Sequence, residues 1–329
     1  MNLPSVLVAR AIFPETLRRL SQHLHVEHNP DDEVWSPAQL LQRLRGKVGL
    51  LATGSERIDA AVLDAHPQLR VVANMAVGFN NIDVAACTSR GVLVTNTPDV
   101  LTETTADFGF ALMMAAARRI SESEHFLRRG EWTKWSYDMF TGPDVHGATL
   151  GILGMGRIGQ AIARRGALGF GMNVLYHNRS RLPPEREAAV RACWVDKATL
   201  LREADHLVLV LPYSAESHHA IGEAELALMK PTATLTNVAR GGIVDDAALA
   251  RALRERRIAA AGLDVFEGEP RVHPDLLAVP NVVLTPHIGS ASVATRRAMA
   301  ELAADNLLAA LCGQRPPTPV NPEVLRHHH

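Results

Sequence analysis

Short apolar runs alternate with helical patterns along the first hundred residues. The runs are VLVAR (6–10), VGLLAT (48–53), VVANM (71–75) and VLVTN (92–96). Continuous apolar runs of this length are typical of strands buried on both faces, and the helical segments between them indicate parallel strands joined by crossover helices. We therefore predict a parallel sheet covered by helices in this region.

The pattern changes after Pro98. From Thr102 to roughly Arg129, alanine, leucine and methionine recur at helical spacing, which predicts one long helix. A second set of apolar runs then alternates with amphipathic segments, as expected for a doubly wound sheet. These runs are TLGILG (149–154), NVLYHN (173–178), HLVLVL (206–211), ATLTNV (233–238), AAGLDV (260–265) and VVLTP (282–286). An amphipathic helix over 293–312 and the Pro-rich tail RPPTPVNP complete the pattern.

Length, composition and charge indicate the number of domains and the classes of partner. A chain of 329 residues suits two domains of roughly 150 residues each. With 34 basic and 35 acidic residues the net charge is −1, which argues against nucleic acid or an anionic membrane as a partner. The longest apolar stretch, 108–117, is too short to span a bilayer, and the N-terminal region lacks the features of a signal peptide. We expect a cytoplasmic protein.

Few residues suggest a metal or a disulfide. The three cysteines, Cys87, Cys193 and Cys312, are unclustered and suit a reducing compartment, and their spacing indicates neither a disulfide framework nor a zinc site. No metal is expected. The terminal His327, His328 and His329 resemble the remnant of a purification tag and are set aside.

A glycine-rich motif follows the run at 149–153 and opens a helical pattern. It reads Gly154-Met155-Gly156-Arg157-Ile158-Gly159. In this context the first glycine permits a tight turn, the second lets a pyrophosphate approach the backbone, and the third lets helix and strand pack closely. We predict a dinucleotide site here, although three glycines also form plain turns in other α/β proteins.

The next strand indicates which dinucleotide is bound. It ends at Asn178, where an NAD-preferring protein usually has an acid that binds the adenine ribose. Here Asn178-Arg179-Ser180-Arg181 removes a charge that would repel a 2′-phosphate and offers donors to bind it. We therefore expect NADP(H) to be preferred, with NAD(H) possible. The alternative is a solvated loop with incidental arginines.

Three further motifs stand at strand ends in the second half: NVARGGIVDD with Arg240, LDVFEGEP with Glu269, and LTPHIGS with His287. Reduction of a keto acid needs a cation for the carboxylate and a proton donor for the oxygen that becomes negative. A guanidinium, and an imidazole beside a carboxylate, meet these needs. Taken one at a time, each residue has an ordinary alternative: Arg240 as a surface cation, Glu269 as a carboxylate in a turn, and His287 as a structural histidine.

Together these motifs closely resemble the D-isomer-specific 2-hydroxyacid dehydrogenase family. The resemblance covers essentially the whole chain, from NMAVGFNNIDV through TPDVLTETTADFGFALMMAAARR, GEWTKW, HGATLGILGMGRIG, NVARGGIVDD and DVFEGEP to TPHIGS. It implies two Rossmann-like or flavodoxin-like domains with doubly wound parallel sheets. A cofactor domain (99–291, with a dimerisation region at 102–147) would be inserted into a discontinuous substrate domain (1–98 and 292–329).

The resemblance also implies roles for individual residues. Arg240 would bind the substrate, Glu269 would partner His287, and His287 would be the general acid in reduction and the general base in oxidation. The backbone amides of Val77 and Gly78 would hold the substrate carboxylate. The other implied cofactor contacts are Thr105, Leu211, Pro212, Ser217, Val238, Ala239, Asp264 at the nicotinamide amide, and Gly289. For Thr105 and Ser217 the alternative is ordinary helix or loop capping.

Within this family, GEWTKW and YHNRS look most like glyoxylate/hydroxypyruvate reductases and 2-ketogluconate reductases. The expected substrate is a small 2-keto acid, and the expected partner is a second copy of the chain. Trp132 and Trp135 either anchor that interface or, as the resemblance suggests, one of them reaches the neighbouring subunit's substrate pocket.

Two other functions remain in view. A non-catalytic dinucleotide-sensing corepressor shares this fold, but the chain has no extended disordered or acidic recruiting tail. Formate or phosphite dehydrogenases are also built on it. For formate we expect a glutamine beside the catalytic histidine, and Pro286 stands there instead.

Overall fold

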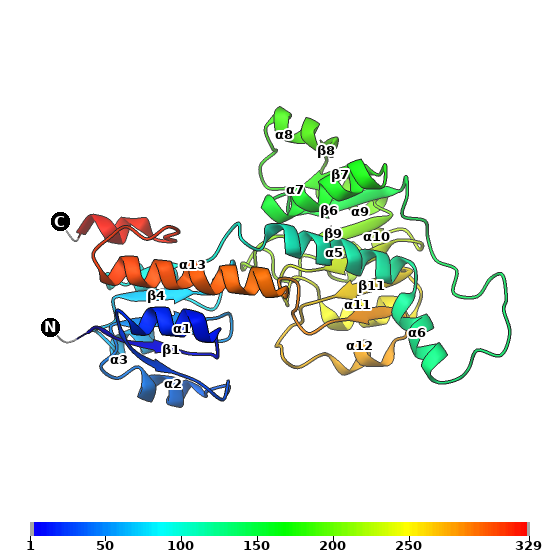
Figure 1. The fold of residues 1–329 in the computed structure, drawn as a ribbon. Helices are drawn as coiled ribbons and strands as arrows, with labels where there is room; N and C mark the ends of the chain where they lie inside the picture. The colour runs from blue at the N-terminus through cyan, green and yellow to red at the C-terminus, as the bar shows by residue number, and fades with distance from the viewer. Residues whose placement is uncertain (1–2, 328–329) are drawn as a thin grey trace. The chain divides into compact units, whose positions relative to one another are not determined.

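The computed structural model describes residues 3–327, so His328 and His329 of the presumed tag lie outside it. The chain forms two compact units, which divide after Leu101 and before Ser292. The element pattern and the family resemblance together placed these divisions after residues 98 and 291. Each unit has a parallel sheet with helices on both faces (Figure 1), which confirms the predicted α/β fold class. Within residues 3–327, no helix is long and apolar enough to cross a membrane.

The discontinuous unit has a five-stranded sheet with the order β2-β1-β3-β4-β5. All its neighbouring strands pair in parallel, in the flavodoxin-like order. The strands are β1 (Ser5–Val8), β2 (His25–His28), β3 (Gly49–Ala52), β4 (Val71–Asn74) and β5 (Leu93–Thr95). Strand β2 was not predicted, because its sequence HVEH is polar and lies at the sheet edge.

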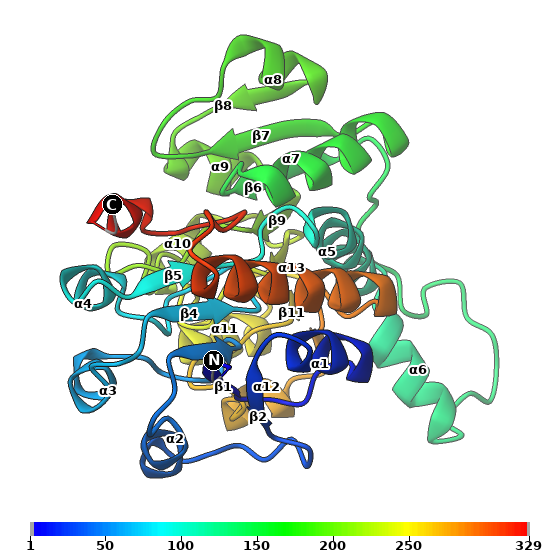
Figure 2. The ribbon, with the colours of Figure 1, turned by 60° about the vertical axis from the view of Figure 1, so that its left-hand side comes forward.

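Helices cover both faces of this sheet (Figure 2). They are α1 (Pro14–Ser21), α2 (Pro37–Arg43), α3 (Ala60–Ala65), α4 (Val84–Ser89) and α13 (Val293–Leu311), with a 3-10 turn at Pro322–His327. Successive strand residues point to opposite faces. Val6 and Val8 therefore pack with α1 and α13, whereas Leu7 packs with Leu40 and Leu44 on the other side.

The C-terminal tail lies along the outer edge of β5. The amide of Val320 donates to the Val94 carbonyl at 2.8 Å. The Asn321 side chain accepts a hydrogen bond from the Val94 amide at 2.7 Å and donates to the Val92 carbonyl at 3.0 Å. The tail thus satisfies backbone groups that an edge strand would otherwise expose.

The second unit has a seven-stranded parallel sheet with the order β12-β11-β10-β9-β6-β7-β8. The strands are β6 (Thr149–Leu153), β7 (Asn173–His177), β8 (Ala192–Trp194), β9 (His206–Leu209), β10 (Thr234–Asn237), β11 (Ala260–Leu263) and β12 (Val282–Leu284). The strand order reverses between β6 and β9, and ligands of such sheets bind at this switch point.

The helices of this unit correct one prediction. They are α5 (Thr102–Ala117), α6 (Ile120–Arg128), α7 (Arg157–Arg164), α8 (Pro184–Ala189), α9 (Lys197–Glu203), α10 (Glu223–Leu228), α11 (Asp246–Arg254) and α12 (Pro274–Ala278), and a π turn, Arg165–Gly169, follows α7. The single helix expected over 102–129 was wrong. Arg119 has a φ of 51°, a left-handed conformation that ends one helix and starts another in a new direction.

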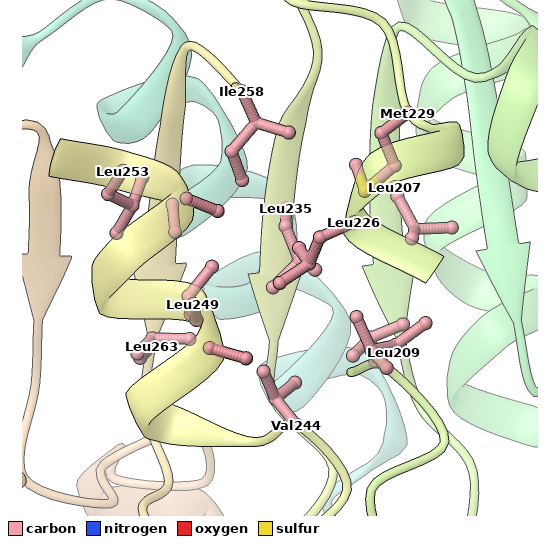
Figure 3. Packing of buried hydrophobic residues seen from close by; sticks show 14 of the residues in the cluster. Leu207, Leu209, Leu226, Met229, Leu235, Val244, Leu249, Leu253, Ile258 and Leu263 are labelled. Atoms are coloured by element: carbon pink, nitrogen blue, oxygen red, sulfur yellow. The ribbon is translucent and has the colours of Figure 1, made fainter. Parts of the chain in front are cut away.

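Two buried clusters hold this sheet in place. Helices α5 and α7 cover one face. On the other face, Leu263 packs with Leu249 and Leu253 of α11, whereas Leu207 and Leu235 lie beside Met229 and Leu226 in the same cluster (Figure 3). Burial of each such side chain contributes about 1.5–3 kcal/mol, so the carboxyl ends of the strands are firmly positioned.

Candidate functional site

The glycine turn after β6 requires glycine at two positions for the protein's own packing. Gly154 has a φ of 103°, and a Cβ there would lie 2.6 Å from the Leu211 amide nitrogen. A Cβ on Gly159 would collide with the Gly154 carbonyl oxygen. Both contacts are too short for a side chain, so the first and third glycines have the roles predicted for the turn and for helix packing.

Gly156 is different, because no heavy atom lies within 4 Å of where its Cβ would be. Gly156 is the N-cap of α7, and the backbone amides at a helix N-terminus attract an anion. The open space beside Gly156 leaves room for that anion. Thr105, which is 7% exposed, supplies a second observation: its hydroxyl has no hydrogen-bond partner in the described chain. An open phosphate cradle and a buried hydroxyl without a partner fit a bound dinucleotide.

Asn178 holds the glycine turn itself. Its side-chain oxygen accepts a hydrogen bond from the Met155 amide at 2.7 Å, and its carbonyl accepts one from the Trp194 indole at 3.2 Å. This oxygen is therefore used within the protein. The Met155 side chain is buried in the core, so only its backbone belongs to the turn.

The two arginines after Asn178 have different surroundings. Arg179 and Ser180 are exposed. Arg181 instead forms two hydrogen bonds, of 2.9 and 2.8 Å, to the carboxylate of Glu187, which also accepts one from the fully buried Tyr176 hydroxyl at 2.7 Å. Arg181 therefore has a partner within the protein, and its guanidinium braces the loop that presents Arg179 and Ser180.

The turn after β9 lies beside Gly154 and contains Leu211, Pro212 and Ser217. The Ser217 hydroxyl donates to the Pro212 carbonyl at 3.0 Å and accepts from the Ser214 amide at 2.7 Å. It closes the turn, which is the ordinary role foreseen as its alternative. Val238 and Ala239, which follow β10, are buried.

Asp264, directly after β11, organises the segment that carries His287. One carboxylate oxygen accepts hydrogen bonds from the Thr285 hydroxyl at 2.7 Å and the Ile288 amide at 2.8 Å. The other accepts one from the Gly289 amide at 2.8 Å. The His287 amide also donates to the Asp264 carbonyl at 2.9 Å. This buried aspartate fixes the backbone on both sides of His287.

His287 and Glu269 form the predicted pair. The Nδ1 of His287 lies 2.7 Å from Oε1 of Glu269, which leaves Nε2 for a ligand. Burial would raise the pKa of Glu269, but the hydrogen bond and charge of His287 outweigh it and hold this pKa below its ordinary value. Glu269 is therefore ionised throughout the neutral range.

Arg240 is the third member of the predicted trio. It follows β10, and its Nη1 donates to the Ala239 carbonyl at 2.7 Å. Burial lowers its pKa, the charge of Glu269 acts in the opposite direction, and a guanidinium stays protonated in proteins. Since β10, β11 and β12 are neighbours, the sheet brings Arg240, Glu269 and His287 to one edge.

Val77 and Gly78 lie in the other unit, in the turn after β4. Asn96 donates to the Val77 carbonyl at 2.8 Å, and Asn74 donates to the Gly78 carbonyl at 2.9 Å. The two amides donate to no acceptor that the structure records in the described residues. A turn with its carbonyls held and its amides available suits an anion.

The predicted interface region has an unusual surface. Between α6 and β6 the chain forms a long loop (Figure 1), on which Trp132 is 56% exposed and Trp135 is 77% exposed.

One cluster of possible metal ligands was not predicted from the sequence: His218 and His219 lie near Glu267. The adjacent histidines were the available signal, but nothing in the sequence indicated their distant partner.

Comparison with known proteins places these features in context. The family model "D-isomer specific 2-hydroxyacid dehydrogenase, NAD binding domain" matches residues 110–289. A glyoxylate reductase of Thermococcus onnurineus is 52% identical over 326 residues, covering 98% of this chain and 97% of that protein.

Solved structures are also similar over nearly the whole chain. The crystal structure of a glyoxylate reductase from Paecilomyes thermophila has a TM-score of 0.87 and 34% identity, covering 98% of this chain and 100% of that one. An NADPH-dependent glyoxylate/hydroxypyruvate reductase from Sinorhizobium meliloti, in complex with NADP and malonate, has a TM-score of 0.84 and 36% identity, with 96% of each chain covered.

Proposed function

Because the chain belongs to the D-isomer-specific 2-hydroxyacid dehydrogenase family, we propose that it reduces a small 2-keto acid, such as glyoxylate or hydroxypyruvate, to the D-2-hydroxy acid. The observation that carries this proposal is the 2.7 Å hydrogen bond between His287 and Glu269, at the sheet edge that also bears Arg240. The names of the relatives favour glyoxylate among the candidate substrates.

Each member of the trio has a distinct chemical task in this proposal. The Arg240 guanidinium binds the substrate carboxylate and polarises the carbonyl. A bound nicotinamide dinucleotide supplies the hydride to the carbonyl carbon. His287, protonated on both ring nitrogens, gives the proton at Nε2 to the carbonyl oxygen, while ionised Glu269 orients and stabilises the imidazolium. In oxidation the neutral imidazole takes that proton back.

The remaining predicted contacts keep their proposed roles where the geometry allows it. Within residues 3–327, one oxygen of Asp264 accepts a hydrogen bond from the Gly289 amide alone, so it would retain a lone pair for the nicotinamide amide. The amides of Val77 and Gly78 would bind the substrate carboxylate. We propose NADPH as the preferred cofactor, because Arg179 and Ser180 are exposed donors and position 178 carries no acid.

A steady-state assay tests this function. Glyoxylate, hydroxypyruvate, 2-ketogluconate, pyruvate, formate and phosphite would each be supplied with both cofactors. We expect the highest kcat/KM for a 2-keto acid with NADPH. Turnover of formate or phosphite alone would identify another enzyme on this scaffold. Dinucleotide binding without turnover of any substrate would favour the corepressor-like function.

A further inference from the structure

Two turns of the Thr102–Ala291 unit bring two histidines and a carboxylate together outside the catalytic trio. His218 and His219 belong to the turn after β9, and Glu267 follows β11. The Nε2 of His219 lies 2.9 Å from Oε2 of Glu267. The two imidazole rings stack with centroids 3.9 Å apart and an angle of 22° between their planes. One nitrogen or oxygen from each residue lies within 4.8 Å of the others.

Contacts outside the cluster hold these side chains in position. The Nδ1 of His218 lies 3.1 Å from the Tyr213 hydroxyl, so Nε2 is the nitrogen left for a ligand. His219 has a φ of 49°, and its amide donates to the Gly242 carbonyl at 2.7 Å. A Cβ on Gly242 would come within 3.1 Å of the Tyr213 ring, so the two turns pack closely.

The residue types define the ligand. Two imidazoles and one carboxylate suit Zn²⁺, Co²⁺, Ni²⁺ or Cu²⁺ better than Mg²⁺ or Ca²⁺. Around Zn²⁺, bonds of about 2.0–2.1 Å place ligand atoms about 3.3 Å apart. To bind one ion, the 2.9 Å distance between His219 and Glu267 must widen and the two stacked rings must tilt so that their planes meet at the metal, which the exposed side chains of His218 and Glu267 allow.

We propose that His218, His219 and Glu267 form a binding site for one divalent transition-metal ion, with Tyr213 orienting His218. Glu267 stands two residues before Glu269. His219 donates to the carbonyl of Gly242, which stands two residues after Arg240. A bound ion would therefore brace the two segments that carry Glu269 and Arg240. The ion takes no part in the proton transfer, and the site does not depend on the proposed substrate.

Metal titration of the chelator-treated protein tests this site. The chain should end at Arg326, because His327, His328 and His329 are metal ligands in their own right. We expect one Co²⁺ per chain, detected by calorimetry and by a visible absorption band, and displaced by Zn²⁺. His218→Gln and Glu267→Gln should each weaken binding at least about tenfold. Tyr213→Phe, which removes the orienting hydroxyl, should weaken it by about 10- to 100-fold.

A matched surface pair provides the control. His125 lies 3.9 Å from Glu124 on α6, and His125→Gln should leave Co²⁺ binding unchanged. Thermal unfolding in chelator should be the same for all variants, which excludes misfolding as the cause of lost binding. Absence of stoichiometric Co²⁺ binding, or equal affinity in wild type and in either the His218→Gln or the Glu267→Gln variant, would overturn the site. Because the readout is binding, the result is separate from the keto-acid assay.

Discussion

The backbone of His287 has a φ of 54°, a left-handed conformation that costs a non-glycine residue about 1–3 kcal/mol. The hydrogen bonds that Asp264 accepts from Thr285, Ile288 and Gly289 offset this cost. They do not involve the imidazole. Removal of the side chain of His287 should therefore leave the loop in place, so that substitution there reports on chemistry.

His287→Ala should lose about 100- to 10,000-fold in kcat, the usual effect of a positioned general acid. Cofactor binding should remain almost normal, because we expect the glycine turn around Gly156 to hold the phosphates. Single-turnover kinetics and a fluorescence titration with NADPH would separate the two effects. Near-normal turnover would show that the proton comes from another group.

Glu269→Gln should change the pH dependence of the reaction. The pKa of Glu269 is held below its ordinary value, so the wild-type side chain is negative across the assay range and favours the protonated imidazole beside it. Glutamine can orient the ring but carries no charge. The pH above which reduction fails should therefore fall in the variant. A kcat profile that does not move between wild type and Glu269→Gln would contradict this coupling.

The hydrogen-bonded pair of His287 and Glu269, at the sheet edge that also bears Arg240, could be predicted from sequence because residue types, order and strand-end positions all carry information. The hydrogen-bond partners of other polar residues could not be predicted from the sequence. Asn178, Ser217 and Arg181 are all plausible cofactor donors in the sequence, but their partners are the Met155 amide, the turn at 212–214 and Glu187. Such contacts depend on segments that only the folded chain brings together.

Among the elements, we expect the loop after β7 to determine the choice of cofactor. Arg179→Ala should reduce the preference for NADPH over NADH by about 1 to 3 kcal/mol, because it removes a charge-assisted contact to the 2′-phosphate. The ratio of kcat/KM values for the two cofactors measures this. Arg186→Ala, a change at an exposed arginine on α8, serves as the control and should keep the wild-type ratio. A wild type that prefers NADH, or full discrimination in Arg179→Ala, would refute our interpretation of this loop.

The elements themselves were predicted best where they are buried. The apolar runs at β1, β3, β4 and β5 mark strands covered on both faces, whereas the polar β2 and the three-residue β8 have no such run. The boundary between α5 and α6 was missed for a related reason. Helical spacing continues through Arg119, and only its backbone conformation shows that the helix ends.

For the whole molecule, the exposed aromatic side chains between α6 and β6 predict self-association. Trp132, Trp135 and Tyr137 are all exposed within six residues of one loop, which is typical of a segment that a partner covers. We expect a homodimer at micromolar concentration by sedimentation, built on residues 102–147. Sedimentation as a monomer alone would rule it out.

Trp135→Ala distinguishes the two roles considered for this tryptophan. If it reaches the substrate pocket of the neighbouring subunit, the variant should remain dimeric with a raised substrate KM. If it anchors the interface, the variant should dissociate more readily. A dimer with the normal KM would remove the cross-subunit role, and Tyr137→Ala provides the matched loss of an exposed aromatic on the same loop.

The tail along β5 has a consequence for solubility. Without Val320 and Asn321, the backbone groups of Val92 and Val94 would face solvent on an apolar strand, an arrangement that invites strand addition from another molecule. A chain ending at Gly313 should therefore aggregate during refolding, as light scattering would show. We therefore expect the last fourteen described residues to protect this strand edge from amyloid-like stacking, and extensions of the C-terminus should be designed to leave them in place.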